Sequence, residues 1–148
     1  MCRYANEKLH GSLSICTSAY THICTFKKMI SFKRIDHIHI CVPPERLEEA
    51  RTFYADIIGL TEKYRPDVFG RPGHWFDVGG IELHIGVEAP LPRSIRHSAF
   101  EVADVKAAKA YLESKGLEIV YEPVIPGRER FSFIDPFGNR MELLEFEG

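Results

Sequence analysis

Two histidines and two glutamates recur in this chain at one fixed spacing. His97 follows His37 and Glu142 follows Glu82 at the same distance, since 97 − 37 and 142 − 82 are both 60. Imidazole nitrogens and carboxylate oxygens together suit Mn, Fe, Co, Ni or Zn, whereas Mg and Ca prefer more oxygen ligands. An octahedral ion with four protein ligands keeps two adjacent positions for a bidentate substrate, such as a hydroxy-carbonyl compound or a catechol. Such an ion stabilises a developing enediolate as a Lewis acid. The pattern therefore predicts one divalent metal site that takes one His and one Glu from each half.

The sequence around these four positions repeats as well. Residues 36–42 match residues 96–102, and Gly59-Leu60 matches Gly116-Leu117. The period is longer than in solenoid repeats, so the two copies predict one domain built from two modules. We place module one at residues 33–88 and module two at residues 93–147, within a single domain at 31–148. Residues 1–30 fit neither module, and we expect them to be a poorly ordered N-terminal extension.

Composition narrows the class of protein. The chain has 148 residues, 45% of them hydrophobic and 27% charged, with a formal net charge of −2, which is typical of one globular domain. A charge near zero argues against nucleic acid or a membrane surface as the main partner. No apolar run approaches the roughly 18 residues that span a bilayer. Nothing suggests a disulfide framework, so we expect a cytoplasmic location. Cys16, His22 and Cys24 match no zinc-binding spacing.

Hydrophobic periodicity predicts the same elements in each half, namely a strand, a helix and three further strands. In the first half these are residues 34–42, a helix at 45–58, and strands at 61–65, 73–78 and 81–87. In the second half they are residues 95–102, a helix at 104–115, and strands at 118–122, 130–134 and 140–146. Asp104 is expected to cap the second helix, and Gly59 and Gly116 to end the two helices. The fold class is therefore α+β.

Strand alternation predicts which side chains share a face of each sheet. All four repeated residues fall on the face away from the helices. Two curved four-stranded sheets side by side would form a cup with these residues inside. His39 and His84 share that face, and each is a candidate substrate contact, acid–base group or support for a ligand. His84 is also an alternative to Glu82 as the ligand.

Several segments resemble the vicinal oxygen chelate superfamily, which includes glyoxalase I, methylmalonyl-CoA epimerase, extradiol dioxygenases and the fosfomycin and bleomycin resistance proteins. They are residues 36–42, 51–54 with 58–60, 96–100 and 135–142. The resemblance covers about residues 33–147. It implies two tandem βαβββ modules that form a cup-shaped mixed sheet with helices outside, often in a homodimer. It also places the family's metal positions on His37, His97 and Glu142, and a fourth on Glu82.

The resemblance also implies an activity. With a Glu at the fourth ligand position, the site is similar to those of glyoxalase I and the epimerase. The resemblance implies a small α-hydroxy-carbonyl or thiohemiacetal substrate. A ligand carboxylate, Glu82 or Glu142, is expected to take the proton α to the substrate carbonyl. In bacterial glyoxalase I, the resemblance implies an Arg and an Asn that contact glutathione, each four residues after one of the first two ligands. Here those two places hold Cys41 and Gly86, which argues against glutathione as a cosubstrate. Arg128 and Arg130 are candidates for binding an anionic part of the substrate.

Other activities of the same superfamily stay open. A three-ligand site of His37, His97 and Glu142 would resemble an extradiol-type dioxygenase, and a site without metal a non-catalytic antibiotic-binding protein. A fosfomycin thiol transferase is a further alternative.

Overall fold

The computed structural model describes residues 30–148, and residues 34–148 form one compact unit. The first module contains β1 (His37–Val42), η1 (Pro44–Arg46), α1 (Leu47–Thr52), η2 (Phe53–Ile57), β2 (Thr61–Lys63), β3 (His74–Val78) and β4 (Ile81–Val87). The second contains β5 (His97–Glu101), α2 (Val105–Ser114), β6 (Glu118–Val120), β7 (Arg128–Ile134) and β8 (Arg140–Phe146). This order confirms the α+β prediction in both halves. The expectations for Cys16, His22, Cys24 and the N-terminal extension fall on residues 1–29, outside the described residues.

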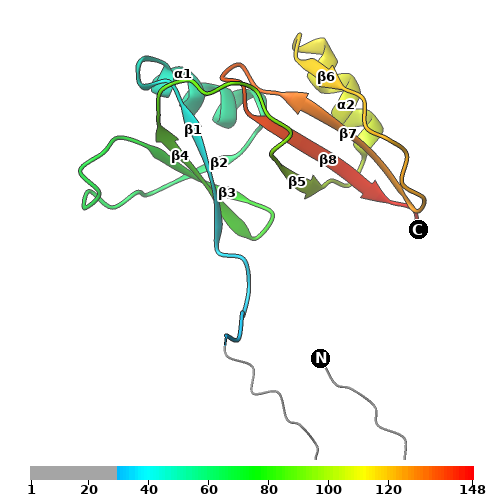
Figure 1. Cartoon of the computed structure of the whole chain (residues 1–148), viewed down its shortest axis with the longest axis horizontal. Helices are drawn as coiled ribbons and strands as arrows, with labels where there is room; N and C mark the ends of the chain where they lie inside the picture. Colours follow the sequence, from blue (N-terminus) through cyan, green and yellow to red (C-terminus); the bar gives the residue numbers. More distant parts are fainter. Residues whose placement is uncertain (1–29) are drawn as a thin grey trace, which may run out of the picture. The chain divides into compact units, whose positions relative to one another are not determined.

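Each module forms its own four-stranded mixed sheet, as Figure 1 shows. The strand orders are β1-β4-β3-β2 and β5-β8-β7-β6, so both modules have the same topology. The first and last strands of each module pair in parallel, and the other neighbours pair antiparallel. Among residues 30–148, no strand of one sheet pairs with a strand of the other. No helix in this part of the chain is long and apolar enough to cross a membrane.

The helices follow the local sequence signals. The helix predicted at 45–58 is present as η1, α1 and the π-helical η2 in succession. In α2, the Asp104 side chain accepts a hydrogen bond from the Ala107 backbone N–H at 2.8 Å, which confirms the predicted cap. Gly116 follows α2 with a φ of +75°, a conformation that glycine adopts without strain.

A buried tyrosine joins the two modules. Tyr54, in η2, is fully buried, and its hydroxyl donates to Asp135 Oδ2 at 2.6 Å. Asp135 also closes the predicted turn between β7 and β8, because its Oδ1 accepts from the backbone N–H groups of Phe137 and Asn139. The Asn139 side chain then donates to the Cys41 carbonyl at 3.1 Å, at the end of β1. This turn therefore links the second module to the first.

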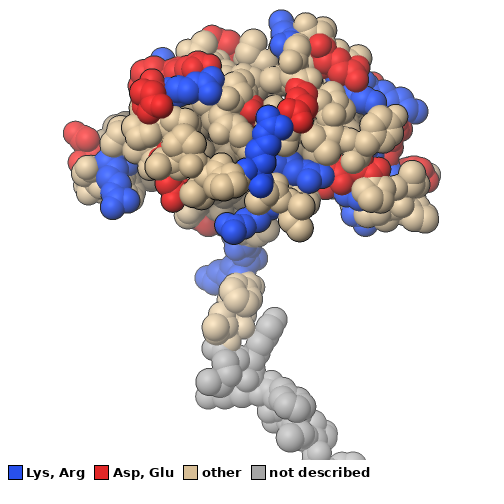
Figure 2. All heavy atoms as spheres, turned by 45° about the horizontal axis from the view of Figure 1, so that its top comes forward, with Lys and Arg blue, Asp and Glu red and all other residues tan. Residues whose placement is uncertain are grey.

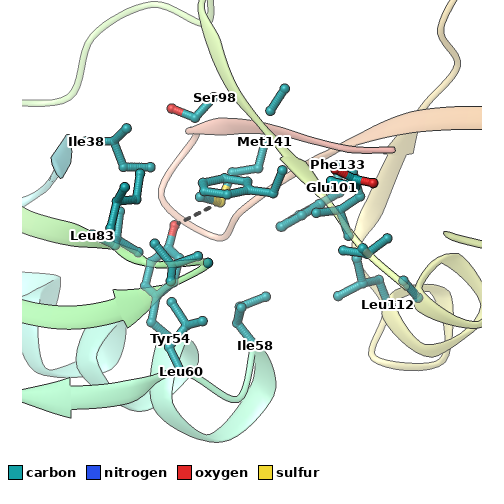
Figure 3. Close-up of a pocket in the computed structure, with 18 of the residues that line it drawn as sticks. Ile38, Tyr54, Ile58, Leu60, Leu83, Ser98, Glu101, Leu112, Phe133 and Met141 are labelled. Carbon is teal, nitrogen blue, oxygen red and sulfur yellow. Dashed lines mark hydrogen bonds between the residues drawn. The ribbon is translucent and has the colours of Figure 1, made fainter. Parts of the chain in front are cut away.

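A largely apolar cavity of about 920 Å³ lies between the modules. Figure 3 shows that side chains from both modules point into it, including Ile38 and Leu83 from the first sheet and Phe133 and Met141 from the second. By strand alternation these are the helix-facing side chains of the two sheets. The space between the modules of one chain is therefore lined mainly by the face opposite to the predicted ligands, and Ala99 and Glu101 of the other face also reach it.

Candidate metal centre

The first sheet places His37, Glu82 and His84 on its helix-free face. β1 and β4 run in parallel, with His37 opposite Glu82 and His39 opposite His84. Glu82 Oε2 accepts from His84 Nε2 at 2.8 Å, and its Oε1 accepts from Lys63 Nζ at 2.8 Å. These hydrogen bonds, first His84 and then Lys63, lower the pKa of the Glu82 carboxyl to about 2. Glu82 is therefore a carboxylate at neutral pH.

His84 lies between two other rings. Its imidazole stacks on His37 with centroids 4.1 Å apart and on Trp75 with centroids 4.2 Å apart. Only 12% of the His84 side chain is exposed, against 26% for Glu82. With both ring faces covered and Nε2 bonded to Glu82, His84 is arranged to support that carboxylate. The structure gives no support to the expectation that His84 contacts substrate.

His39 occupies space that a glycine leaves open. A Cβ atom built on Gly86 would lie 2.5 Å from His39 Nε2, so any larger residue would displace the ring. Burial, followed by the nearby His84 and His37, lowers the pKa of His39. The glycine that departs from the glutathione-binding pattern therefore has a packing role in this chain.

The second sheet pairs His97 with Glu142. His97 Nε2 lies 3.0 Å from Glu142 Oε2, and the Glu142 side chain is only 5% exposed. His97 Nδ1 lies 2.8 Å from the Ile95 carbonyl oxygen, which can only accept, so Nδ1 carries the proton. In a neutral ring this directs the Nε2 lone pair toward a carboxylate oxygen. His97 Nε2 and Glu142 Oε2 would therefore be suited to hold a divalent cation.

His37 is oriented in the same way. Its Nδ1 lies 3.2 Å from Asp36 Oδ2, so a proton on Nδ1 leaves Nε2 as a free donor atom. Histidines that bind metals usually donate their other N–H to a carboxylate or a carbonyl. In both histidines, the hydrogen bond at Nδ1 thus suits the binding of a divalent ion through Nε2. Asp36 was missed by the sequence reasoning, although it directly precedes His37.

The two arginines proposed to bind substrate are already engaged or covered. Arg130 donates to Glu142 Oε1 at 3.0 Å and to the Pro123 carbonyl. The Arg128 guanidinium lies over the Phe146 ring, 5.1 Å from its centroid. Neither arrangement supports the expected anion site, and substrate binding by Arg128 and Arg130 stays a prediction.

Strand register differs between the modules. His37 is paired with Glu82, but His97 is paired with Arg140, while Glu142 is paired with Ala99. Ala99, two residues after His97, pairs with Glu142 in the second sheet. In the first sheet His39, two residues after His37, pairs with His84. The 60-residue echo in the sequence is thus not an equivalence in strand pairing, and His84 takes the structural position of Glu142.

One chain holds the predicted ligands as two separate sets. Among residues 30–148, no three His, Cys, Asp or Glu side chains gather closely enough to hold a metal ion. His37 and Glu82 lie on the first sheet. His97 and Glu142 lie on the second sheet, and in the described part of the chain its strands do not pair with those of the first. Within residues 30–148, the four predicted ligands are therefore not gathered into one site inside the predicted cup.

The chain is similar to known proteins both in sequence and in structure. Residues 34–143 match the model of the Glyoxalase/Bleomycin resistance protein/Dioxygenase superfamily. The uncharacterized protein YaeR of Escherichia coli (strain K12) is 32% identical over 131 residues, which cover 79% of this chain and 99% of YaeR. The metallothiol transferase FosB of Lysinibacillus sphaericus (strain C3-41) is 27% identical over 117 residues, which cover 71% of this chain and 78% of FosB. The crystal structure of a putative glyoxalase family protein from Bacillus anthracis superposes with a TM-score of 0.72 at 38% identity, over 80% of this chain and 98% of that one.

Proposed function

This chain belongs to the Glyoxalase/Bleomycin resistance protein/Dioxygenase superfamily, and we propose that it is a metal-dependent lyase or isomerase acting on a small α-hydroxy-carbonyl or thiohemiacetal substrate. One observation carries the proposal. On the helix-free face of each sheet, a histidine with its Nδ1 held by an acceptor lies near a carboxylate. This arrangement leaves two nitrogen and two oxygen donors, a set that suits Mn, Fe, Co, Ni or Zn.

In this proposal His37, Glu82, His97 and Glu142 hold one ion. When bound, the ion would act as a Lewis acid that acidifies the C–H bond next to the substrate carbonyl. Glu82 is favoured over His84 as the fourth ligand, because its carboxylate is more exposed and His84 is covered on both ring faces.

The two carboxylates differ in their suitability for moving a proton. Glu82 is 26% exposed and is held by the half-exposed, flexible Lys63, whereas Glu142 is 5% exposed and held by Arg130. The more accessible carboxylate accepts a proton from substrate with less rearrangement, and it becomes a stronger base as the hydrogen bonds from His84 and Lys63 that lower its pKa are released. We therefore assign the general base to Glu82, with the buried Glu142 as a fixed ligand.

The complete site requires two copies of the chain. β1 and β5 are the edge strands that carry the two histidines, and no strand of the described chain covers either edge. Ile35 and Ile95, which precede these strands, are 68% and 83% exposed. Exposed apolar side chains beside an open strand edge favour association with another chain. We infer a twofold dimer in which the first sheet of each copy faces the second sheet of its partner.

The test combines metal loading, activity and subunit mixing. The chain is loaded with Ni, Co, Mn or Zn and assayed with hemithioacetal and α-hydroxy-carbonyl substrates. Loss of the general base or of a ligand is expected to lower kcat by about 10²- to 10⁴-fold in Glu82→Gln and in Glu142→Gln. Full activity in both variants would refute the proposal.

Mixing the two inactive variants tests where the site is assembled. In a mixed dimer, one site would carry both substitutions and the other would carry neither. Random exchange makes half of the dimers mixed, so roughly one quarter of the wild-type sites should return. No recovery after verified exchange would show that each site lies within one chain.

A metal-dependent thiol transferase is the second candidate, because FosB, named a metallothiol transferase, is a sequence relative. The two candidates are separated by titrating a small thiol with an electrophilic epoxide present. A transferase consumes the thiol as a new C–S bond forms, whereas a lyase or isomerase leaves the thiol unchanged.

A further inference from the structure

Glu142 is the centre of a buried cluster of charged side chains on the helix-free face of the second sheet. Its Oε1 accepts from Arg130 Nη1 at 3.0 Å, and its Oε2 lies 3.0 Å from His97 Nε2. Each oxygen thus has a different neighbour. The oxygen beside His97 is the one directed toward the proposed ion.

Arg130 is itself fixed in place. Its Nε and Nη2 both donate to the Pro123 carbonyl, at 3.3 and 3.0 Å, and its side chain is 14% exposed. The planar guanidinium therefore bridges the backbone after β6 and the Glu142 carboxylate. A guanidinium held at both ends has one orientation, and so does the carboxylate that it binds.

A second carboxylate balances the charge of the cluster. Glu122 is 8% exposed and accepts from the Ser132 hydroxyl and from Arg140, and its Oε2 lies 4.0 Å from Arg130 Nη2. Burial raises the pKa of Glu122, but these hydrogen bonds outweigh it and the pKa is lowered. Two arginines thus face two glutamates, so Arg130 can stay buried beside Glu142 without an uncompensated charge.

The carboxylate of the first module has no such support. Lys63, which donates to Glu82, is 39% exposed and is shared with Asp77 at 3.2 Å. An ammonium group on a flexible stem fixes a position less firmly than a guanidinium with two anchors. Of the two carboxylates, Glu142 is therefore the one held by an anchored guanidinium.

We propose that Arg130 is a positioning residue, which holds Oε1 of Glu142 so that Oε2 stays beside His97 as a metal donor. This inference rests on the proposed function, because it concerns the same metal site. It assigns Arg130 to the protein framework of the site, in place of the substrate contact that the sequence suggested.

The experiment measures metal affinity on the full-length chain, with Co(II) as the probe and calorimetry as the readout. Arg130→Met removes both the bridge and the charge, and we expect a Kd for Co(II) about 10- to 100-fold higher, as for other residues that orient metal ligands. Arg130→Lys keeps the charge but cannot span Glu142 and Pro123, so its Kd should rise by a similar factor. Arg93→Met, which breaks an exposed ion pair with Glu118, is the control and should leave the Kd unchanged.

Two results would overturn the inference. A wild-type Kd in folded Arg130→Lys would show that the bridge does not position the ligand. Tighter binding in Arg130→Met would show that the positive charge opposes the ion more than the bridge helps it. A changed Co(II) absorption spectrum in the variants is the signature of altered ligand geometry, which a purely structural role would not produce. If the wild-type chain binds no Co(II), the proposed function fails together with the inference. If the wild-type chain binds Co(II) and Arg130→Lys binds it equally well, the inference alone fails, so the two failures are distinguishable.

Discussion

Replacing Tyr54 by phenylalanine removes one oxygen atom from the junction between the modules. The Tyr54 hydroxyl is fully buried and lies 2.6 Å from Asp135 Oδ2, and Asp135 is 3% exposed. Burial, and then Asp135, raises the pKa of Tyr54 well above its usual value, so the hydroxyl remains a donor at neutral pH. A hydrogen bond to a charged group contributes about 1.5–3 kcal/mol. Asp135 keeps donors from Phe137 and Asn139, so we expect a loss near the middle of that range, about 2 kcal/mol.

The chain offers a matched control for this substitution. Tyr111 follows Tyr54 by 57 residues, the same offset that relates Gly116 to Gly59. Its hydroxyl donates to the Ile57 carbonyl at 3.0 Å, but the residue is 43% exposed. Water can replace that bond, so Tyr111→Phe should cost less than about 0.5 kcal/mol. At roughly 4 °C per kcal/mol for a domain of this size, Tyr54→Phe should lower Tm by about 8 °C.

The assay is urea and thermal unfolding of both variants at one fixed protein concentration, because association shifts apparent stability. Equal losses in Tyr54→Phe and Tyr111→Phe would refute the reasoning, since only the buried hydroxyl bonds a carboxylate. A change in the denaturant m-value would indicate that the modules separate before they unfold.

Two further substitutions test the packing and the buried charge. Gly86→Ala should cost about 1–3 kcal/mol in urea unfolding, because the new methyl group meets His39 Nε2 at 2.5 Å. A second substitution, His39→Ala, should remove that cost, and a Gly86→Ala penalty that persists beside it would exclude this clash as the cause. Glu122→Gln should be less stable than the wild type at neutral pH. Because the folded-state pKa of Glu122 lies below its usual 4.5, its contribution is present above pH 4.5 and is lost as the pH falls through the lowered value. The gap between the two proteins should therefore shrink below pH 4.5, and a constant gap would contradict the assigned shift.

Local patterns predicted the elements and the faces of the strands. The βαβββ order, the Asp104 cap and the turn at residues 135–139 are present as expected. Side-chain alternation also predicted the shared face of His97 and Glu142, which lie 3.0 Å apart. These features depend on residues close together in the chain and on a strand period of two, so the sequence contains them directly.

The partners of each candidate ligand were not predictable in the same way. Lys63 bonds Glu82 across the intervening strand β3, and His84 bonds it from within the same strand. Arg130 bonds Glu142 from the neighbouring strand. A repeated spacing in the sequence also concealed the difference in register, because pairing depends on the lengths of the connections between strands. Arg130 looked like a free cation in the sequence, whereas in the fold each of its three nitrogens has an acceptor within 4.0 Å.

The sequence by itself determined that two His and two Glu recur in equivalent modules, on the face away from the helices. The tertiary structure decided that His84 supports Glu82, that Arg130 holds Glu142, and that one chain separates the two ligand sets. The physical reason is that alternation fixes the direction of a side chain, whereas its neighbours are set by strand register and by the packing of one module on the other.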